Sequence, residues 1–239
     1  MRKIVIIPTY NEIENVEDII HAIFALPSAY HVLIVDDNSP DGTAKRVQFL
    51  QQQYQEQLFL LQRPQKNGLG TAYVAGFHWA LKRDYDYIFE MDADFSHAPE
   101  DLDKLLYACE NGADMSIGSR YVTGVNVVNW PLSRVLLSYF ASVYVRFITG
   151  MDIMDTTAGF VCYKRRVLEE IQLSNIKFVG YAFQIEMKYR TYCKKFVLKE
   201  VPIVFTDRTK GQSKMTSGII KEAIFGVLQL KMKQLLKQL

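Results

Sequence analysis

The sequence predicts an α/β fold in which helices cover a mostly parallel β-sheet. Short apolar segments alternate with helical ones through the first half of the 239-residue chain. The strand-like segments are apolar throughout rather than at every second residue, which is typical of a sheet buried on both faces. Polar motifs follow these segments directly, and in open α/β sheets the ligand crevice lies beyond the carboxyl ends of the strands. The three observations together predict a sheet with a polar site at one edge.

The first half contains strand-like segments rich in Val, Ile, Leu and Phe, the first of which ends at Pro8. They are Lys3–Ile7, His31–Val35, Gln57–Leu61, Tyr87–Met91 and Met115–Ile117. Helical spacing of apolar residues predicts helices between them, the first with Asn11 as a candidate N-cap. These helices are expected at Asn11–Phe24, Gly70–Lys82 and Pro99–Asn111.

The second half is more apolar and less regular. Trp130–Ile148 is strongly apolar but contains Arg134 and Arg146. A membrane-spanning helix needs about 20 predominantly apolar residues, so two arginines argue against a span here. Further strands are expected at Val161–Tyr163 and Val201–Phe205, with a helix near Tyr181–Tyr192 between them. Ser217–Leu239 has the spacing of an amphipathic helix, with lysines at 221, 231, 233 and 237.

Composition places the chain among ordinary globular proteins, with 49% hydrophobic and 23% charged residues. No repeat and no linker rich in Pro, Gly or Ser divides it, so we expect one domain over residues 1–215 with an appended amphipathic helix over 216–239. The first residues have neither the apolar run nor the cleavage site of a signal peptide. Cys109, Cys162 and Cys193 match no disulfide or metal spacing, which favours a reducing cytoplasm.

The net charge of +2 conceals an asymmetry along the chain. Residues 208–239 contain seven Lys or Arg and one acidic residue, so the rest of the chain is mildly acidic. A basic tail suits an anionic partner, either membrane headgroups or a phosphorylated ligand. No nucleic-acid recognition motif is present, and no nucleic-acid partner is expected.

Asp92 and Asp94 form the sharpest chemical motif, directly after an apolar strand. Two carboxylates one residue apart at a strand end can turn toward one ion. Mg²⁺ binds proteins through one or two carboxylates and completes its shell with substrate phosphates and water. A pair of this kind can also simply cap the helix expected from Pro99, and the short motif alone does not decide between the two interpretations.

Two further loops at strand ends suit a nucleoside. Val35–Thr43 carries three acids in a turn-rich stretch, where Asp41 and Gly42 fit turn chemistry and Asp37 is the candidate for a base or ribose contact. Pro8–Glu12 lies at the mouth of the first strand and is either a base-binding loop or only a helix cap.

Six motifs in this order resemble the family-2 inverting glycosyltransferases, and among them the dolichol-phosphate (polyprenol monophosphate) mannose synthases. The similarity spans residues 3–215. The motifs are Pro8–Glu12, Val35–Thr43, Gly68–Tyr73, Met91–Pro99, Gly118–Tyr121 and Asp155–Phe160.

The resemblance implies a GT-A fold, GDP-mannose as the donor, a polyprenyl phosphate acceptor and Mg²⁺ or Mn²⁺ as the cofactor. Residues at matching positions would hold the guanosine: Pro8, Tyr10, Glu12, Val35 and Asp37. Those expected at the metal and the diphosphate are Asp92, Ala93 and Asp94, with Ser96 completing the metal environment where some members have Gln.

Basic residues are implied at the phosphates of both substrates. The expected contacts to the lipid phosphate are Arg120, Arg134, Ser138 and Arg208, of which Arg120 and Arg208 are also expected at the donor. Lys214 matches a donor-phosphate contact. Arg134 and Ser138 are four residues apart on one expected helix and therefore face the same way. For each arginine alone, a solvated surface charge is the plainer interpretation.

The chemistry that the resemblance implies suits these residue types. A phosphate monoester is already an anion at neutral pH and needs no general base to act as a nucleophile. It needs charge compensation, which arginines and a metal supply. A single displacement would invert the anomeric carbon.

Trp130–Ile148 and the C-terminal helix suit a membrane surface, since interfacial helices combine an apolar face, aromatic residues and lysines. Both can instead be core or oligomer-contact helices. With no spanning segment, the protein is expected to be peripheral on the cytoplasmic face of a membrane, with a small membrane-anchoring subunit as a possible partner.

Three alternatives stay open. The same chemistry can act on another sugar, such as glucose from a UDP donor, or on a hydroxyl acceptor, which would need a base such as Asp152 or Asp155. A nucleotide-sugar pyrophosphorylase would favour a Gly-rich phosphate loop near the first strand, which Pro8–Glu12 is not. A non-catalytic nucleotide-binding module is disfavoured by the Asp92/Asp94 pair.

Overall fold

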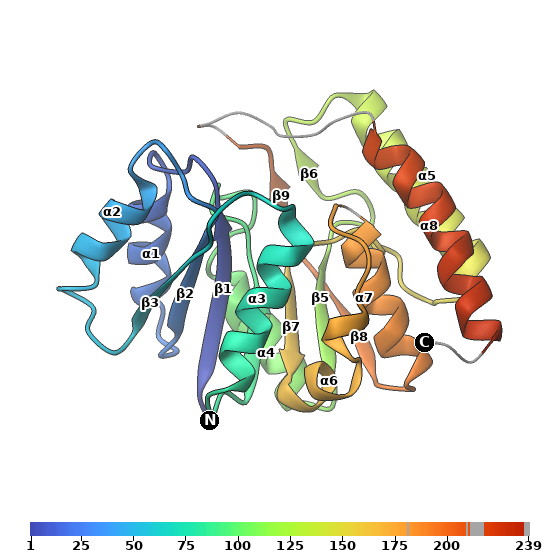
Figure 1. Ribbon diagram of the computed structural model, residues 1–239. Coiled ribbons are helices and arrows are strands. Elements are labelled where there is room, and N and C mark those ends of the chain that lie inside the picture. Colours follow the sequence, from blue (N-terminus) through green and yellow to red (C-terminus); the bar gives the residue numbers. More distant parts are fainter. Residues whose placement is uncertain (181, 209, 211–217, 237–239) are drawn as a thin grey trace.

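A seven-stranded sheet forms the centre of the molecule in the computed structural model, which describes residues 1–180, 182–208, 210 and 218–236 (Figure 1). The strand order is β3-β2-β1-β4-β7-β5-β8. Only β7 is antiparallel to its neighbours, so the predicted mostly parallel sheet is confirmed. The strands are β1 (Lys3–Thr9), β2 (His31–Asp36), β3 (Leu58–Gln62), β4 (Tyr87–Glu90), β5 (Met115–Ser119), β7 (Val161–Lys164) and β8 (Leu198–Pro202). A small second sheet pairs β6 (Val127–Val128) with β9 (Phe205–Thr206).

Helices cover both faces of the large sheet, as Figure 1 shows. One face packs on α1 (Val16–Phe24), α2 (Thr43–Leu50) and α4 (Asp101–Glu110). The other packs on α3 (Leu69–Leu81), α6 (Arg165–Glu170) and α7 (Ala182–Cys193), with a 3₁₀ turn at Leu173–Asn175. Two long helices, α5 (Leu132–Thr149) and α8 (Gly218–Leu235), lie side by side beyond α7.

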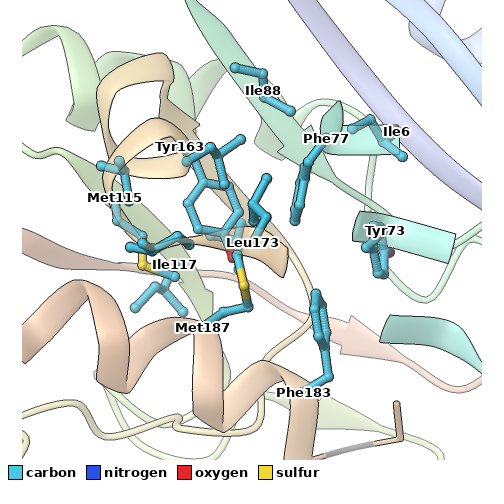
Figure 2. Close-up of a cluster of buried hydrophobic side chains, with 14 of the residues drawn as sticks. Ile6, Tyr73, Phe77, Ile88, Met115, Ile117, Tyr163, Leu173, Phe183 and Met187 are labelled. Carbon is cyan, nitrogen blue, oxygen red and sulfur yellow. The ribbon is translucent and has the colours of Figure 1, made fainter. Parts of the chain in front are cut away.

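Alternate residues of each strand supply the two cores. Ile4 and Ile6 of β1 belong to the cluster on the α3 side, and Val5 and Ile7 belong to the cluster on the α1 side. The α3-side cluster includes the aromatic rings shown in Figure 2. A Cβ at Gly76 would lie 2.6 Å from Cγ2 of Ile6, so glycine lets α3 approach β1 closely.

Strand β1 is longer than expected and continues through Pro8 to Thr9. The Ile6 carbonyl accepts from the Met91 amide at 3.2 Å, which is the end of the pairing with β4. The main-chain nitrogen of Pro8, two residues later, points to the same side of the strand, beyond the last pair with β4. Its missing N–H therefore removes no hydrogen bond from the ladder.

The first helix begins later than expected, at Val16, and Asn11 is not its N-cap. Asn11 has a φ of +57°, and its N–H donates to Oγ of Ser39 at 3.0 Å. The N–H of Glu12 likewise donates to Oγ1 of Thr43 at 3.1 Å. These hydrogen bonds join the segment after β1 to the loop after β2. They keep Asn11 and Glu12 in a non-helical conformation, so α1 begins only after them.

The strand expected at Val201–Phe205 is divided between β8 and β9. Ile203 and Val204 separate them, and the Phe205 amide donates to the Asn126 carbonyl at 3.0 Å. The chain thus leaves the large sheet and pairs with β6, which carries it toward the end of β4. Across the described residues, no helix combines the length and apolarity needed to traverse a bilayer.

Helix α8 is confirmed over Gly218–Leu235 and has two apolar faces rather than one. Val227 and Leu230 are buried against the core, whereas Phe225 is 70% and Leu235 is 68% exposed. The expected boundary between residues 215 and 216 lies outside the described residues, so the division into a domain and an appended helix stays a prediction.

Candidate active site

A cavity of about 420 Å³ lies at the carboxyl ends of β4 and β5, between the sheet and helix α5. Its wall includes Asp92, Arg120, Arg134 and Ser138, which come from three separate elements. The remaining wall is largely apolar and includes Leu137 and other residues of α5. The structure therefore brings the predicted strand-end acid and three predicted phosphate contacts to one cavity.

Asp92 and Asp94 follow β4, where Asp94 is buried and Asp92 is partly exposed in the cavity wall. The Asp94 residue is 5% exposed, and its Oδ1 accepts from the Ser96 N–H at 3.1 Å. The Tyr73 hydroxyl donates to Oδ1 of Asp92 at 3.5 Å. Burial, followed by the charge of Asp94, raises the pKa of Asp92 to about 7. The charge of Asp94 thus disfavours that of Asp92, and a bound cation would stabilise both carboxylates.

This acid pair fits a divalent metal. Mg²⁺ and similar hard cations use one or two carboxylates and take their other ligands from phosphates and water. No group of three His, Cys, Asp or Glu side chains with metal-binding geometry occurs within the described ranges, so phosphates and water would complete the shell around Asp92 and Asp94. Ser96 supports Asp94 through its main chain, and its direct contact with a metal stays a prediction.

Arg208 reaches the acid pair from the segment after β9. Its Nη2 lies 2.6 Å from Oδ2 of Asp94. The Thr206 amide donates to the Ser96 carbonyl at 3.2 Å, which fixes β9 beside the loop after β4. The predicted convergence of Arg208 with the acids is thus present in the structure.

Arg120 is held by Asp155 from three directions. Nε donates to Oδ2 at 2.7 Å, Nη2 donates to Oδ1 at 2.7 Å, and the main-chain N–H donates to Oδ2 at 3.0 Å. Burial works against the charge of Asp155, but the charge and hydrogen bonds of Arg120 outweigh it and lower the pKa of Asp155. Asp155 is fully buried and paired, so it cannot serve as a general base.

Arg134 and Ser138 lie one turn apart on α5, on its cavity side, as their spacing predicted. Nη1 of Arg134 donates to Oδ1 of Asp207 at 3.0 Å. Its guanidinium also lies 4.0 Å from the centroid of the Trp130 ring. Both members of the Arg134–Asp207 pair are about 30% exposed, so this arginine is less tightly confined than Arg120.

The residues expected to bind the nucleoside lie together at the ends of β1 and β2. Pro8 and Val35 are register neighbours, and the Asp37 amide donates to the Thr9 carbonyl at 3.0 Å. The side chain of Val35 is packed in the α3-side core. Ala93, expected at the diphosphate, is 4% exposed between the two acids.

The charged members of this group already have partners. Nε of Arg63 lies 2.8 Å from Oδ1 of Asp37. Burial raises the pKa of Asp37, and Arg63 opposes that shift. The amide of Asn15 donates to Oε2 of Glu12 at 3.0 Å, and Lys66 lies 4.4 Å from the centroid of the Tyr10 ring. Lys214, the remaining predicted contact, lies outside the described residues.

Sequence reasoning missed Trp130 and His97 in the cavity wall and Asp207, the partner of Arg134, beside it. Trp130 was visible only as part of an apolar segment, and Asp207 had no motif around it. His97 follows the Asp motif and stacks on Phe160 with ring centroids 4.8 Å apart. Burial lowers the pKa of His97 to about 4, so its imidazole is neutral at physiological pH. Its position within Met91–Pro99 was the one available signal.

Comparisons with known proteins agree with this geometry. The chain is 48% identical to polyprenol monophosphomannose synthase of Mycolicibacterium smegmatis, over 95% of this chain and 86% of that protein. It is 44% identical to undecaprenyl-phosphate mannosyltransferase of Micrococcus luteus, over 95% of this chain and 93% of that protein. It is 37% identical to dolichol-phosphate mannosyltransferase of Pyrococcus furiosus, over 96% of this chain and 64% of that protein.

Solved structures of glucosyl-3-phosphoglycerate synthase from Mycobacterium tuberculosis share the fold. The complex with phosphoglyceric acid has a TM-score of 0.67 at 15% identity, over 98% of this chain and 80% of that one. The complex with Mn²⁺, uridine diphosphate and glucosyl-3-phosphoglycerate has a TM-score of 0.66 at 16% identity, with the same coverage. At such identities the likeness shows the fold alone, and that fold is GT-A-like.

The match to a family profile covers most of the large sheet and the acid pair. Residues 4–172 match the profile described as Glycosyl transferase family 2. Together with the relatives above, this match shows that the chain is a glycosyltransferase of family 2.

Proposed function

We propose that this protein transfers mannose from GDP-mannose to a polyprenyl phosphate, with inversion at the anomeric carbon. The observation that carries the proposal is the single cavity that joins Asp92 to Arg120, Arg134 and Ser138. The names of the three relatives, which are mannose synthases or mannosyltransferases of polyprenyl-type phosphates, support the sugar and the acceptor.

The donor would lie across the ends of β1, β2 and β4. Asp37, Tyr10 and Glu12 are proposed for the guanosine, with Pro8 and Val35 shaping the strand ends beneath it. Asp92 and Asp94 would hold Mg²⁺ or Mn²⁺, which neutralises charge on the departing diphosphate. Their placement immediately after β4 supports this role, and Ala93 and Lys214 are proposed for contacts to the diphosphate.

The acceptor phosphate would enter from the α5 side of the cavity. It is an anion already, so the chain has to orient it and offset its charge rather than remove a proton. Arg134 and Ser138 lie on one face of α5, and Arg120 and Arg208 are proposed to lie between the two substrates. Guanidinium groups suit phosphate oxygens because their N–H donors are planar and forked.

The apolar wall supports a lipid rather than a saccharide acceptor. Leu137, Phe140 and Tyr144 of α5 and Ile224 of α8 line the cavity beyond the arginines. A hydroxyl acceptor would need a general base, but Asp155 is buried in an ion pair and the side chain of Asp152 is 100% exposed. Neither carboxylate is available to deprotonate a hydroxyl group in this cavity.

We also propose that the protein works as a peripheral protein on the cytoplasmic face of a membrane. Phe140 and Phe147 of α5 are 61% and 86% exposed, and Phe225 of α8 is 70% exposed. Large exposed apolar side chains on neighbouring helices favour a lipid interface. The thiols of Cys109, Cys162 and Cys193 are unpaired, which supports a reducing compartment. A small anchoring subunit is a further proposed partner.

The decisive experiment presents the purified chain with a set of labelled nucleotide sugars and a polyprenyl phosphate in vesicles. We expect an organic-soluble, acid-labile mannosyl product from GDP-mannose that requires Mg²⁺ or Mn²⁺. Product from UDP-glucose in preference to GDP-mannose would overturn the assignment of the sugar. Product formed equally well after chelation would overturn the metal dependence.

A further inference from the structure

The guanidinium of Arg120 is held in place by a two-carboxylate support that reaches back to strand β8. Asp155 contacts Arg120 directly, and Glu200 on β8 supports Asp155 in turn. We infer that Asp155 and Glu200 are positioning residues for the acceptor phosphate, because they fix the plane of the Arg120 guanidinium in the cavity wall. This inference rests on the proposed function of the cavity and extends it to two residues behind the wall.

The first level of the support fixes both ends of Arg120. The carboxylate of Asp155 accepts from the side chain and from the main-chain N–H of the same residue. Nη2 also donates to Oγ1 of Thr157, which itself lines the cavity, at 2.9 Å. With Nε and Nη2 bonded on one edge, the guanidinium has one orientation, and little rotamer freedom is left to lose when a ligand binds.

The second level fixes the loop that carries Asp155. Oε2 of Glu200 accepts from the N–H of Met154 at 2.7 Å, and Oε1 accepts from the N–H of Asp155 at 2.9 Å. These residues lie between α5 and β7, outside any strand, so ladder hydrogen bonds do not hold their N–H groups. Glu200 is paired in register with Ile117 of β5, the strand that leads to Arg120. The pairing of β5 with β8 therefore positions Arg120 at one end of the support and Glu200 at the other.

This arrangement gives Arg120 and Arg134 different roles toward a phosphate. The charge of Asp155 offsets that of Arg120 at a distance of 2.7 Å, so Arg120 contributes directed N–H donors more than net charge. Arg134 is more exposed and has a partly exposed partner in Asp207, so a phosphate can displace that partner more easily. Arg120 thus orients the phosphate through its N–H donors, and Arg134 attracts it through its positive charge.

The inference predicts an effect opposite in sign to simple electrostatics. Asp155→Asn and Glu200→Gln each remove a negative charge near an anion site, which on charge alone should tighten binding of a phosphate. Loss of the support should instead weaken it, since the Arg120 guanidinium would have to be ordered when the ligand binds. The direction of the change therefore separates positioning from a bulk charge effect.

The test measures binding of citronellyl phosphate, a ten-carbon isoprenoid phosphate, to the full-length protein by calorimetry without donor. We expect Kd to rise about tenfold in Asp155→Asn and about threefold in Glu200→Gln, in line with one or a fraction of a charged hydrogen bond. Binding of GDP with Mg²⁺ should change less than this, because the residues proposed for the guanosine follow β1 and β2, which β4 and β7 separate from β5 and β8 in the sheet.

Asp114→Asn is the matched control. Asp114 is also a buried carboxylate, it pairs with Arg166, and its Oδ2 accepts from the Val197 N–H at 3.0 Å. It precedes β5, whereas Arg120 follows β5, so it lies at the opposite end of the same strand. This variant should lose thermal stability much as the other two do and keep its affinity for citronellyl phosphate.

Unchanged or tighter citronellyl phosphate binding in both Asp155→Asn and Glu200→Gln would overturn the inference, and so would an equal loss in Asp114→Asn. If Asp155→Asn fails to fold, Glu200→Gln decides alone, because Glu200 does not touch Arg120. The proposed function is judged separately, by whether the wild type makes mannosyl lipid. Wild-type protein that binds the phosphate but transfers no mannose would refute the function and leave the Kd comparison valid.

Discussion

Nη2 of Arg208 lies 2.6 Å from Oδ2 of Asp94, although the two residues follow different strands. The contact joins an acid proposed for the metal to an arginine proposed for the substrate phosphates. It also places a positive charge where a divalent cation would have to approach. A change at Arg208 should therefore raise metal affinity while it lowers turnover, whereas a change at Asp94 should lower both.

Replacing Arg208 with Gln should tighten Mn²⁺ binding in the absence of nucleotide while it lowers transfer. Unit charges about 4 Å apart interact by about 4 kcal/mol at an effective dielectric of about 20, and partial exposure screens much of this. We therefore expect an increase in Mn²⁺ affinity of about threefold or more. Titration followed by electron paramagnetic resonance measures it. Arg46→Gln, which breaks the pair between Arg46 of α2 and Glu17 of α1, is the control and should leave Mn²⁺ affinity unchanged.

Replacing Asp94 with Asn should abolish the metal-dependent part of GDP binding. The wild type should bind GDP more tightly when Mg²⁺ or Mn²⁺ is added, and this gain should fall by about tenfold or more in the variant. Calorimetry with and without the metal gives the comparison. Asp41→Asn changes a turn carboxylate that hydrogen bonds to Thr43 and should retain the gain. A full gain in Asp94→Asn would exclude Asp94 as a ligand.

Replacing Arg134 with Ala should impair use of the lipid far more than it weakens GDP binding. The side chain lies in the cavity wall on the α5 side, so its loss removes charge facing the acceptor. We expect the KM for the polyprenyl phosphate to rise about tenfold or more, with GDP affinity nearly constant. Arg146→Ala removes an arginine of the same helix whose partner is the exposed Asp152. Equal losses for both substrates would move Arg134 to the donor side.

Replacing Phe147 and Phe225 with Ser should weaken binding to anionic vesicles. Each buried Phe contributes about 1.5–3 kcal/mol, so the bound fraction in co-sedimentation should drop by about fivefold or more. Phe49→Ser on α2, where Phe49 is 59% exposed, tests whether any exposed ring suffices. Unchanged sedimentation of the double variant would contradict the membrane role and favour an oligomer contact for α5 and α8. Deleting residues 218–239 is a poorer test, because it also removes the buried Val227 and Leu230.

Acid should destabilise the fold partly through His31. Burial, aided by the nearby charge of Arg2, lowers the pKa of His31 below its ordinary 6.5. Below pH 6.5, His31 is therefore protonated to a greater extent in the unfolded chain than in the folded chain. The free energy of unfolding consequently falls as the pH decreases toward the folded-state pKa. In urea titrations between pH 7 and pH 5, His31→Gln should show a shallower decline than the wild type. His78→Gln, an exposed change on α3, should show the wild-type decline.

Much of the fold could be predicted from local pattern. Continuous apolar runs such as His31–Val35 identified the strands of the large sheet, since strands buried on both faces have no polar alternation. The placement of Asp92 and Asp94 directly after an apolar run identified the edge of the sheet where the cavity lies. The spacing of Arg134 and Ser138 correctly placed both on one face of α5.

The errors have a common physical origin. The start of α1 depended on hydrogen bonds from the segment after β1 to Ser39 and Thr43, residues far along the chain. The break between β8 and β9 depended on pairing with β6. In each case a contact with a distant segment overrode the local propensity, and no window of neighbouring residues contains that contact.

The sequence alone determined most strands of the large sheet, several of its helices, the acid pair and the resemblance to family-2 glycosyltransferases, because these depend on residue types and spacings within short segments. It gave no sign of α2, α6 or β6. Only the tertiary structure decided which charges face one another. Asp155 with Arg120, Asp207 with Arg134 and Asp94 with Arg208 are pairs across separate elements. Such pairings arise when the sheet is assembled and its strand ends are brought to one edge, and their burial determines whether an arginine provides charge or only direction.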